Sequence, residues 1–280
     1  MWAQTTPAPD LQDEHYGPES KNTFDLWKAR AEAPAPLVVL IHGGGFSSGS
    51  KKDVSRKLIG ALLGKGMSVM TIDYRLTPEA VFPQHYQDCV RAIQYARFHA
   101  QELNIDSTRI GAGGSSAGAC TAMWIGFHDD MADPASADPV LRMSTRLSCV
   151  AEFSGQTTLE PDLVKEWIGD FALKHSFFKG AFFGLKEEDL KGSHTHDLFR
   201  QASPMAYLTP DDPPVWAYYS GSKDPPVNLS EAVHHYSFGV HLKERMDSLD
   251  IPCVLLQGES GKPVNGNCAE FFVQYLRDKP

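Results

Sequence analysis

The 280-residue chain has little of what marks several large classes of protein. Its five cysteines are widely spaced and include no CxxC pair, so neither a disulfide framework nor a zinc site is indicated. It has 26 Lys and Arg against 35 Asp and Glu, a formal net charge of −9, and no long basic run, which argues against nucleic-acid binding. No stretch approaches the roughly 18 consecutive apolar residues of a membrane span. We therefore expect a globular protein with a small-molecule partner.

The N-terminus is similarly uninformative about targeting. Residues 1–9 lack the charged and apolar regions of a signal peptide. A leader removed before this point would leave such a stub. The sequence leans slightly toward a secreted or periplasmic location, with the cytoplasm as the alternative.

Apolar runs and amphipathic segments alternate along most of the chain. This alternation is typical of an α/β protein with a mostly parallel central sheet and helices on its faces. The runs predict strands at 37–41, 67–74, 109–114, 147–153, 215–219 and 253–256. Helical spacing predicts helices at 84–103, from 117 through 127, around 238–249 and around 271–276. We expect one domain over residues 1–280.

Residues 156–213 break this alternation. They include several phenylalanines and show no clear strand. We interpret them as a helical cap inserted between two strands, over the carboxyl ends of the sheet. The phenylalanines either supply apolar walls for a ligand or form the core of the cap itself.

The first chemical motif is GSSAG at 114–118, which fits G-x-S-x-G between a predicted strand and a predicted helix. Small residues around Ser116 allow a tight turn with the serine at its apex. A serine hydroxyl becomes a good nucleophile when it is exposed, beside a base and near helix N-terminal amides. Ser116 is therefore the candidate nucleophile.

The second motif is HGGGF at 42–46, directly after the strand predicted at 37–41. Consecutive glycines let the backbone approach a substrate and direct N–H groups toward an oxyanion. A dinucleotide site is a weak alternative, because the glycines do not fit G-x-G-x-x-G and no Walker lysine follows. His42 is expected to order this loop.

Together, HGGGF, the DYRLTPE stretch at 73–79 and GSSAG resemble hormone-sensitive-lipase-like carboxylesterases of the α/β-hydrolase superfamily. The resemblance covers most of residues 20–280. It implies the α/β-hydrolase fold with an inserted cap, and Ser116 as the nucleophile. It also implies an oxyanion hole formed by the amides of Gly44, Gly45 and Ala117.

The acid and the base are less clear. In that family the acid follows the strand that corresponds to 215–219, and Asp224 occupies a similar setting; a solvated loop aspartate is the alternative. The family's histidine follows the last strand, but no histidine occurs after His241. A triad transferred from the family is therefore incomplete.

Three explanations for the missing histidine stay open. The base has moved to His234 or His235, with His234 slightly favoured, since triads are defined by geometry rather than chain order. Alternatively, the chain has lost efficient catalysis and binds ligands with a hydrolase fold. Finally, a histidine of the cap or of a neighbouring subunit, such as His194 or His196, reaches the site.

The sequence thus predicts a serine carboxylesterase that hydrolyses short-chain esters through an acyl-enzyme. A carbohydrate esterase, acetyl or feruloyl, and a catalytically impaired binding protein are the alternatives. No cofactor or metal is expected, because the HTHD stretch at 194–197 lacks a further spaced group of ligands. The partner is a small ester, and a homo-oligomer stays open.

Overall fold

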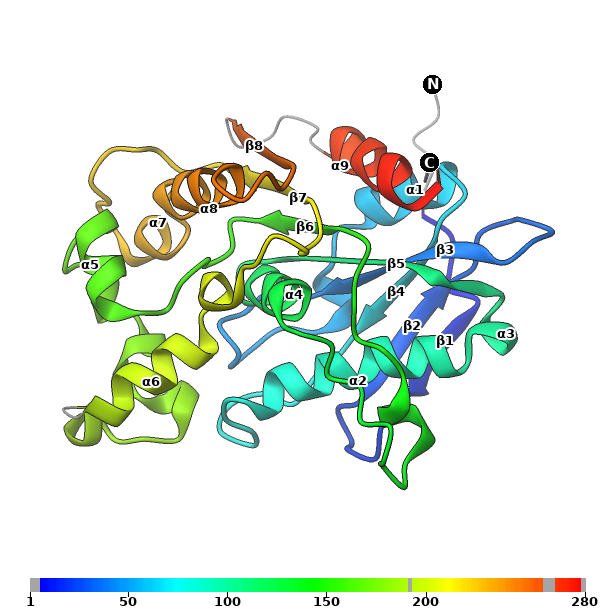
Figure 1. Ribbon diagram of the computed structural model, residues 1–280, viewed down its shortest axis with the longest axis horizontal. Helices are drawn as coiled ribbons and strands as arrows, with labels where there is room; N and C mark the ends of the chain where they lie inside the picture. The colour runs from blue at the N-terminus through cyan, green and yellow to red at the C-terminus, as the bar shows by residue number, and fades with distance from the viewer. Residues whose placement is uncertain (1–5, 191–192, 259–264, 278–280) are drawn as a thin grey trace.

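A computed structural model describes residues 6–190, 193–258 and 265–277. Its centre is an eight-stranded sheet in the order β1-β2-β4-β3-β5-β6-β7-β8 (Figure 1). The strands are β1 (Leu11–His15), β2 (Thr23–Trp27), β3 (Ala35–Ile41), β4 (Ser68–Ile72), β5 (Ile105–Ser115), β6 (Val150–Phe153), β7 (Val215–Tyr219) and β8 (Cys253–Gln257).

Strand direction divides the sheet into two parts. From β4 to β8 every neighbouring pair is parallel, whereas β1 and β2 pair antiparallel with each other and β2 pairs antiparallel with β4. The predicted α/β class with a mostly parallel sheet is confirmed. The apolar runs predicted neither β1, whose LQDEH run is mostly exposed at the edge of the sheet, nor β2, whose TFDLW run is mostly buried. The APLVVLI run of β3 is entirely buried, as a central parallel strand requires.

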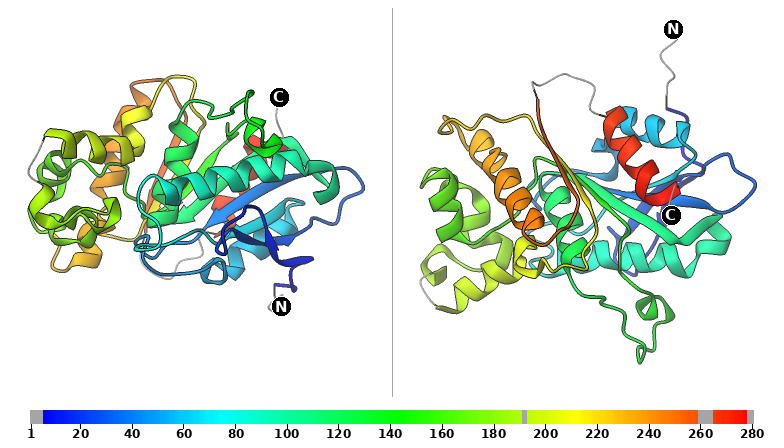
Figure 2. Two further views of the ribbon diagram at one scale, coloured as in Figure 1. Left: turned by 90° about the horizontal axis from the view of Figure 1, so that it is seen from below. Right: turned by 45° about the horizontal axis from the view of Figure 1, so that its top comes forward.

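Helices cover both faces of the sheet (Figure 2). On one face lie α1 (Arg56–Gly64) and α9 (Asn265–Phe272), which share a core with Val38, Leu40 and Val69. The other face carries α2 (Gln84–Phe98), α3 (Ala100–Leu103), α4 (Ala117–Phe127) and α8 (Ser237–Asp247). The helix predicted at 84–103 is two helices that meet at His99. Within the described residues, no helix is both long and apolar enough to cross a membrane.

The segment 156–213 lies between β6 and β7 and contains no strand in its described residues. It forms α5 (Pro161–Ile168), η3 (Ala172–Lys174), η4 (Ser176–Lys179), η5 (Ala181–Phe183), η6 (Glu187–Leu190), α6 (Ser193–Ala202) and η7 (Pro204–Tyr207). Figure 1 shows α5 and α6 at the opposite end of the molecule from α3. The phenylalanines of the segment 156–213 mainly pack with one another and with Phe46 and Phe82.

The carboxyl ends of the parallel strands bring the two motifs together. The 42–46 loop follows β3, and Ser116 follows β5, which is the neighbour of β3 in the sheet. The chain after β7 leads into the short helix α7 (Leu229–Val233) and then into α8. Ligands of open α/β sheets bind at this edge, so the candidate site is sought here. The remaining short elements are η1 (Lys51–Asp53), η2 (Pro139–Arg142) and the π-helical turn η8 (Val273–Arg277).

Candidate active site

Ser116 is held in a strained turn between β5 and α4. Its backbone has φ 53° and ψ −121°, a conformation that L-residues rarely adopt and that concentrates at functional sites. Its amide donates to the Phe153 carbonyl at 2.9 Å. The turn also packs closely on β3, because a methyl group on Gly118 would lie 2.1 Å from the Ile41 carbonyl oxygen. The small residues of GSSAG therefore let strand, turn and helix approach closely enough to present the Ser116 hydroxyl.

Among the described residues, backbone amides without a hydrogen-bond partner occur in the glycine loop and directly after Ser116. Gly44 has φ 110°, and a methyl group there would lie 2.1 Å from the Ser48 carbonyl oxygen, so only glycine fits without a shift. Within the described residues neither the Gly44 nor the Gly45 amide donates a hydrogen bond. Ala117 is the first residue of α4, where amides have no partner inside the helix. These groups are available to an anionic oxygen.

His42 fixes the loop that carries these glycines. Its Nδ1 donates to the Gly43 carbonyl at 2.7 Å, and its ring stacks on Tyr74 with centroids 4.4 Å apart. The Tyr74 hydroxyl donates to the His42 carbonyl at 3.0 Å. Burial lowers the pKa of His42. A neutral, stacked imidazole thus orders the loop, as expected from the sequence.

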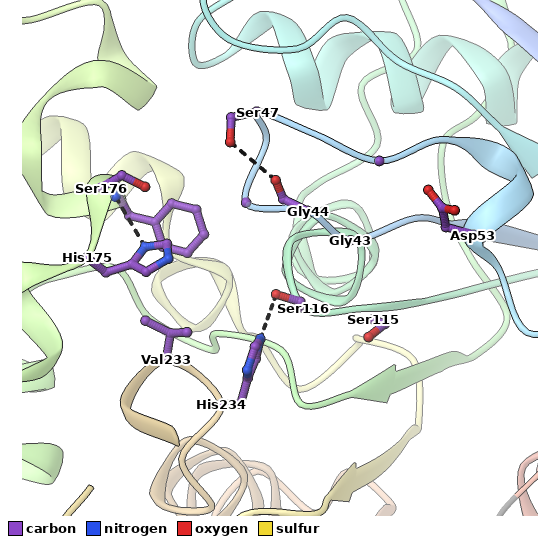
Figure 3. A pocket seen from close by; sticks show the side chains of 13 residues that line it. Gly43, Gly44, Ser47, Asp53, Ser115, Ser116, His175, Ser176, Val233 and His234 are labelled. Atoms are coloured by element: carbon purple, nitrogen blue, oxygen red, sulfur yellow. Dashed lines mark hydrogen bonds between the residues drawn. The ribbon is translucent and has the colours of Figure 1, made fainter. Parts of the chain in front are cut away.

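His234 is the histidine that the structure brings to Ser116 (Figure 3). Its Nε2 lies 2.9 Å from the Ser116 Oγ, at the C-terminal end of α7. The serine hydroxyl can donate to this nitrogen when the ring is neutral and carries its proton on Nδ1. Burial lowers the pKa of His234 and the Ser230 carbonyl opposes that shift.

The neighbouring His235 has a different environment. It is buried, its Nε2 donates to the Asp224 carbonyl at 3.0 Å, and its Nδ1 accepts from the Ser237 amide at 3.2 Å. Both ring nitrogens are therefore used by the backbone. This imidazole ties the loop after β7 to the start of α8.

The Asp224 carboxylate does not reach His234. It is exposed and accepts from the Ser222 hydroxyl at 2.6 Å. Among the described residues, no carboxylate forms a hydrogen bond or ion pair with His234.

The alternative histidines lie elsewhere or are not described. His196 is exposed and faces Asp162, with Nδ1 and Oδ2 3.8 Å apart. The side chain of His194 lies outside the described residues, as does the 259–264 part of the loop after β8. In the described part of the chain, no group of three or more His, Cys, Asp or Glu residues is placed to hold a metal ion.

A pocket of about 510 Å³ opens over Ser116 and His234. Beside the glycine loop and the two candidate residues, its walls include Ser47, Asp53, His175, Ser176, Phe177 and Val233. Most of these side chains are polar. Of the phenylalanines in 156–213, only Phe177 lines the pocket; the others are buried in, or packed against, the core that also contains Phe46 and Phe82.

His175 is a pocket residue that sequence reasoning missed. Its Nδ1 accepts from the Phe177 amide at 3.4 Å, and its Cε1 lies 3.9 Å from where a Gly45 methyl would be. Burial, and then the charge of His234, lower the pKa of His175. No motif surrounds His175, and it reaches the pocket only because 156–213 folds back over the glycine loop.

Comparison with known proteins places this site in a class. The chain superposes on a truncated carbohydrate esterase from gut microbiota with a TM-score of 0.76 and 18% identity, covering 98% of both chains. Together with the sheet order, this defines the α/β-hydrolase fold. Residues 24–237 match the protein family described as BD-FAE, and the chain belongs to that family.

Two curated relatives are esterases. Esterase LipQ of Mycobacterium tuberculosis is 27% identical over 235 residues, which cover 82% of this chain and 51% of LipQ. The acetyl esterase of Salmonella choleraesuis is 27% identical over 250 residues, which cover 83% of this chain and 65% of that enzyme. The chain thus spans about half to two thirds of the length of these relatives.

Proposed function

We propose that this protein is a serine carboxylesterase in which Ser116 is the nucleophile and His234 the general base. The proposal rests on the 2.9 Å distance between Ser116 Oγ and His234 Nε2. In the described residues, the amides of Gly44 and Gly45 in the nearby loop donate no hydrogen bond. Both groups line one pocket that is large enough for a small ester. The esterase relatives and the family support the same reaction.

The reaction proceeds in two halves. His234 Nε2 takes the proton of the Ser116 hydroxyl while Oγ attacks the ester carbonyl carbon. The amides of Gly44, Gly45 and Ala117 stabilise the oxyanion that forms. Collapse releases the alcohol, which receives the proton from His234. A water molecule, deprotonated by the same imidazole, then attacks the acyl-enzyme, and the carboxylic acid leaves with Ser116 restored.

Among the described residues, no carboxylate supports His234 in this arrangement. The Ser230 carbonyl favours the protonated ring, but it stabilises the imidazolium less than the full negative charge of a triad acid does. In the proposed dyad, the His234 ring is still oriented, but its imidazolium form is stabilised less. We therefore expect a lower turnover than that of a complete triad.

The pocket favours small substrates with polar groups. We propose short-chain acyl esters as substrates, with 156–213 acting as the cap of a single α/β-hydrolase domain. Acetyl esters of carbohydrates are a second candidate, since Ser47, Asp53 and Ser176 offer hydroxyl and carboxylate partners to a sugar. The gut carbohydrate esterase of the same fold supports this alternative.

Hydrolysis of p-nitrophenyl acetate and butyrate by wild type and Ser116→Ala tests the proposal. We expect wild type to turn over, with the acetate ester favoured, and Ser116→Ala to lose at least about 10³-fold in kcat. Thermal unfolding of both proteins checks that the variant is folded. Equal rates for the two proteins would support the non-catalytic binding protein instead. Release of acetate from acetylated xylan decides between simple esters and carbohydrate esters.

A further inference from the structure

The end of β6 and the residues that follow it contact both halves of the proposed dyad. At its start, the Phe153 carbonyl accepts the amide of Ser116 at 2.9 Å. Three residues later, the side-chain Nε2 of Gln156 donates to the Val233 carbonyl, in the peptide that joins Val233 to His234. Residues 153–156, which we call the β6 bridge, therefore bind the backbone beside the nucleophile and the backbone beside the base.

The β6 bridge is itself held rigidly. The Gly155 amide donates to the buried Glu152 carboxyl at 2.8 Å, and the Gly155 carbonyl accepts from the Tyr219 hydroxyl at 2.6 Å. Gly155 also packs closely on α4, since a methyl group there would lie 2.7 Å from the Ala119 Cβ. A fixed Gly155 peptide sets the position from which the next residue, Gln156, reaches α7.

Gln156 is a polar side chain at a fully buried position. Its side chain is 1% exposed, and in the described part of the chain its Oε1 has no hydrogen-bond partner. Burying an amide with one polar atom unpaired costs about 1–3 kcal/mol, and removing the amide leaves the Val233 carbonyl without this donor at a comparable cost. The two costs largely offset each other, so the bond adds little net stability while it fixes where the Val233 peptide lies.

We propose that Gln156 is a positioning residue for His234. By holding the Val233 carbonyl, it fixes the end of the five-residue helix α7 and with it the distance between Nε2 and the Ser116 hydroxyl. A base whose ring contacts no carboxylate of the described residues depends on such backbone support. The inference rests on the proposed dyad.

Gln156→Met is the test, because it keeps the length of the side chain and removes the donor. The expected result is a loss of kcat of about 10-fold to 10²-fold on p-nitrophenyl acetate, with KM within about 2-fold and the variant still fully folded at the assay temperature. Thr157→Val is the matched control: it removes the equally buried hydrogen bond from the Thr157 hydroxyl to the Phe238 carbonyl of α8, at 3.1 Å. That variant is expected to keep kcat within about 3-fold of wild type.

A His234→Gln background separates positioning from a structural role. There Gln156→Met is expected to cause no further loss of kcat, because the base that it positions is already absent. Gln156→Asn, whose amide does not reach Val233, serves in the same comparison if the Met variant does not fold. Wild-type kcat in Gln156→Met, or an equal loss in both backgrounds, overturns the inference. If Ser116→Ala and His234→Gln turn over as wild type does, the proposed function itself has failed.

Discussion

The two sides of the site are built in different ways. On the nucleophile side, the backbone itself supplies the geometry: a positive φ at Ser116, a positive φ at Gly44 and close approaches that admit no Cβ at Gly118. On the base side, His234 stands at the end of a short helix whose position depends on side chains distant in sequence, such as Gln156. The first side tolerates almost no substitution, whereas the second has room to be rebuilt.

For the proposed dyad, this difference gives a reason why the base can lie on a different element while the nucleophile keeps its place. Gly44, Gly45 and Ser116 have positive φ, and Gly43, Gly114 and Gly118 have no room for a Cβ, so a substitution at these glycines forces the backbone to shift. A general base must only reach hydrogen-bond distance with the correct tautomer. The end of α7 satisfies that requirement from a different element of the fold.

Among variants that keep both Ser116 and His234, the largest effect is expected on the nucleophile side, from Gly44→Ala. The methyl group collides with the Ser48 carbonyl and forces the loop out of its φ 110° conformation, so an oxyanion donor is lost. We expect kcat to fall about 10²-fold to 10³-fold in steady-state assays. Gly64→Ala is the control, since a methyl group there meets nothing within 4 Å and replaces a helical glycine of α1. If the control loses as much activity as Gly44→Ala, the loop geometry is not the cause.

The titration of His234 should determine how kcat/KM depends on pH. Burial lowers the pKa of His234 below its usual value of about 6.5, and no carboxylate of the described residues opposes that shift. The base works when it is neutral, so kcat/KM should rise with pH through a midpoint below about 6.5 and stay level above it. Rates on p-nitrophenyl acetate between pH 4.5 and 8 measure this midpoint. A midpoint above 7 would mean that a negative charge stabilises the imidazolium.

Asp224→Asn tests whether Asp224 acts as the acid of a complete triad. Replacing the acid of a working triad by its amide costs about 10⁴-fold in kcat. Here the Asp224 carboxylate is exposed and bonded to Ser222, so we expect a loss below about 3-fold. A loss in the range of a true triad acid would show that the loop after β7 rearranges to reach His234 during turnover.

The smallest effect on activity is expected from Glu152→Gln, which changes stability instead. Burial raises the pKa of Glu152 from about 4.5 to about 8, so between these values the folded protein holds a proton that the unfolded chain has released. The unfolding free energy therefore falls as pH rises through this window, by about 1.4 kcal/mol per pH unit for this group. Urea unfolding at pH 5, 6, 7 and 8 should show that slope reduced by this amount in the variant. Identical slopes would place the ionised carboxylate in the folded state.

Local patterns carried most of the fold. The apolar runs of β3 and β7 and the amphipathic stripe of α8 are readable because burial demands them. Strand β1 was not readable, because its mostly exposed side chains give no such pattern. The break between α2 and α3 at His99 likewise has no strong sequence signal.

The sequence predicts those site residues that belong to short motifs of adjacent residues. Ser116 and the glycine loop are indicated by residues adjacent in sequence, whereas the choice between His234 and His235 depends on which way each ring points from the end of α7. The contribution of His175 and Gln156 depends on chain folding across more than fifty residues. No spacing rule predicts such contacts.

The most direct test of the account compares His234→Gln with His235→Gln in the hydrolysis of p-nitrophenyl acetate, with rates expressed per folded protein. Both variants replace one imidazole by an amide at adjacent positions, so they differ mainly in which ring is lost. The account predicts that His234→Gln loses about 10³-fold or more in kcat, while His235→Gln stays within about 3-fold of wild type. Comparable turnover in His234→Gln and wild type, or a collapse only in His235→Gln, would contradict a displaced base at the end of α7.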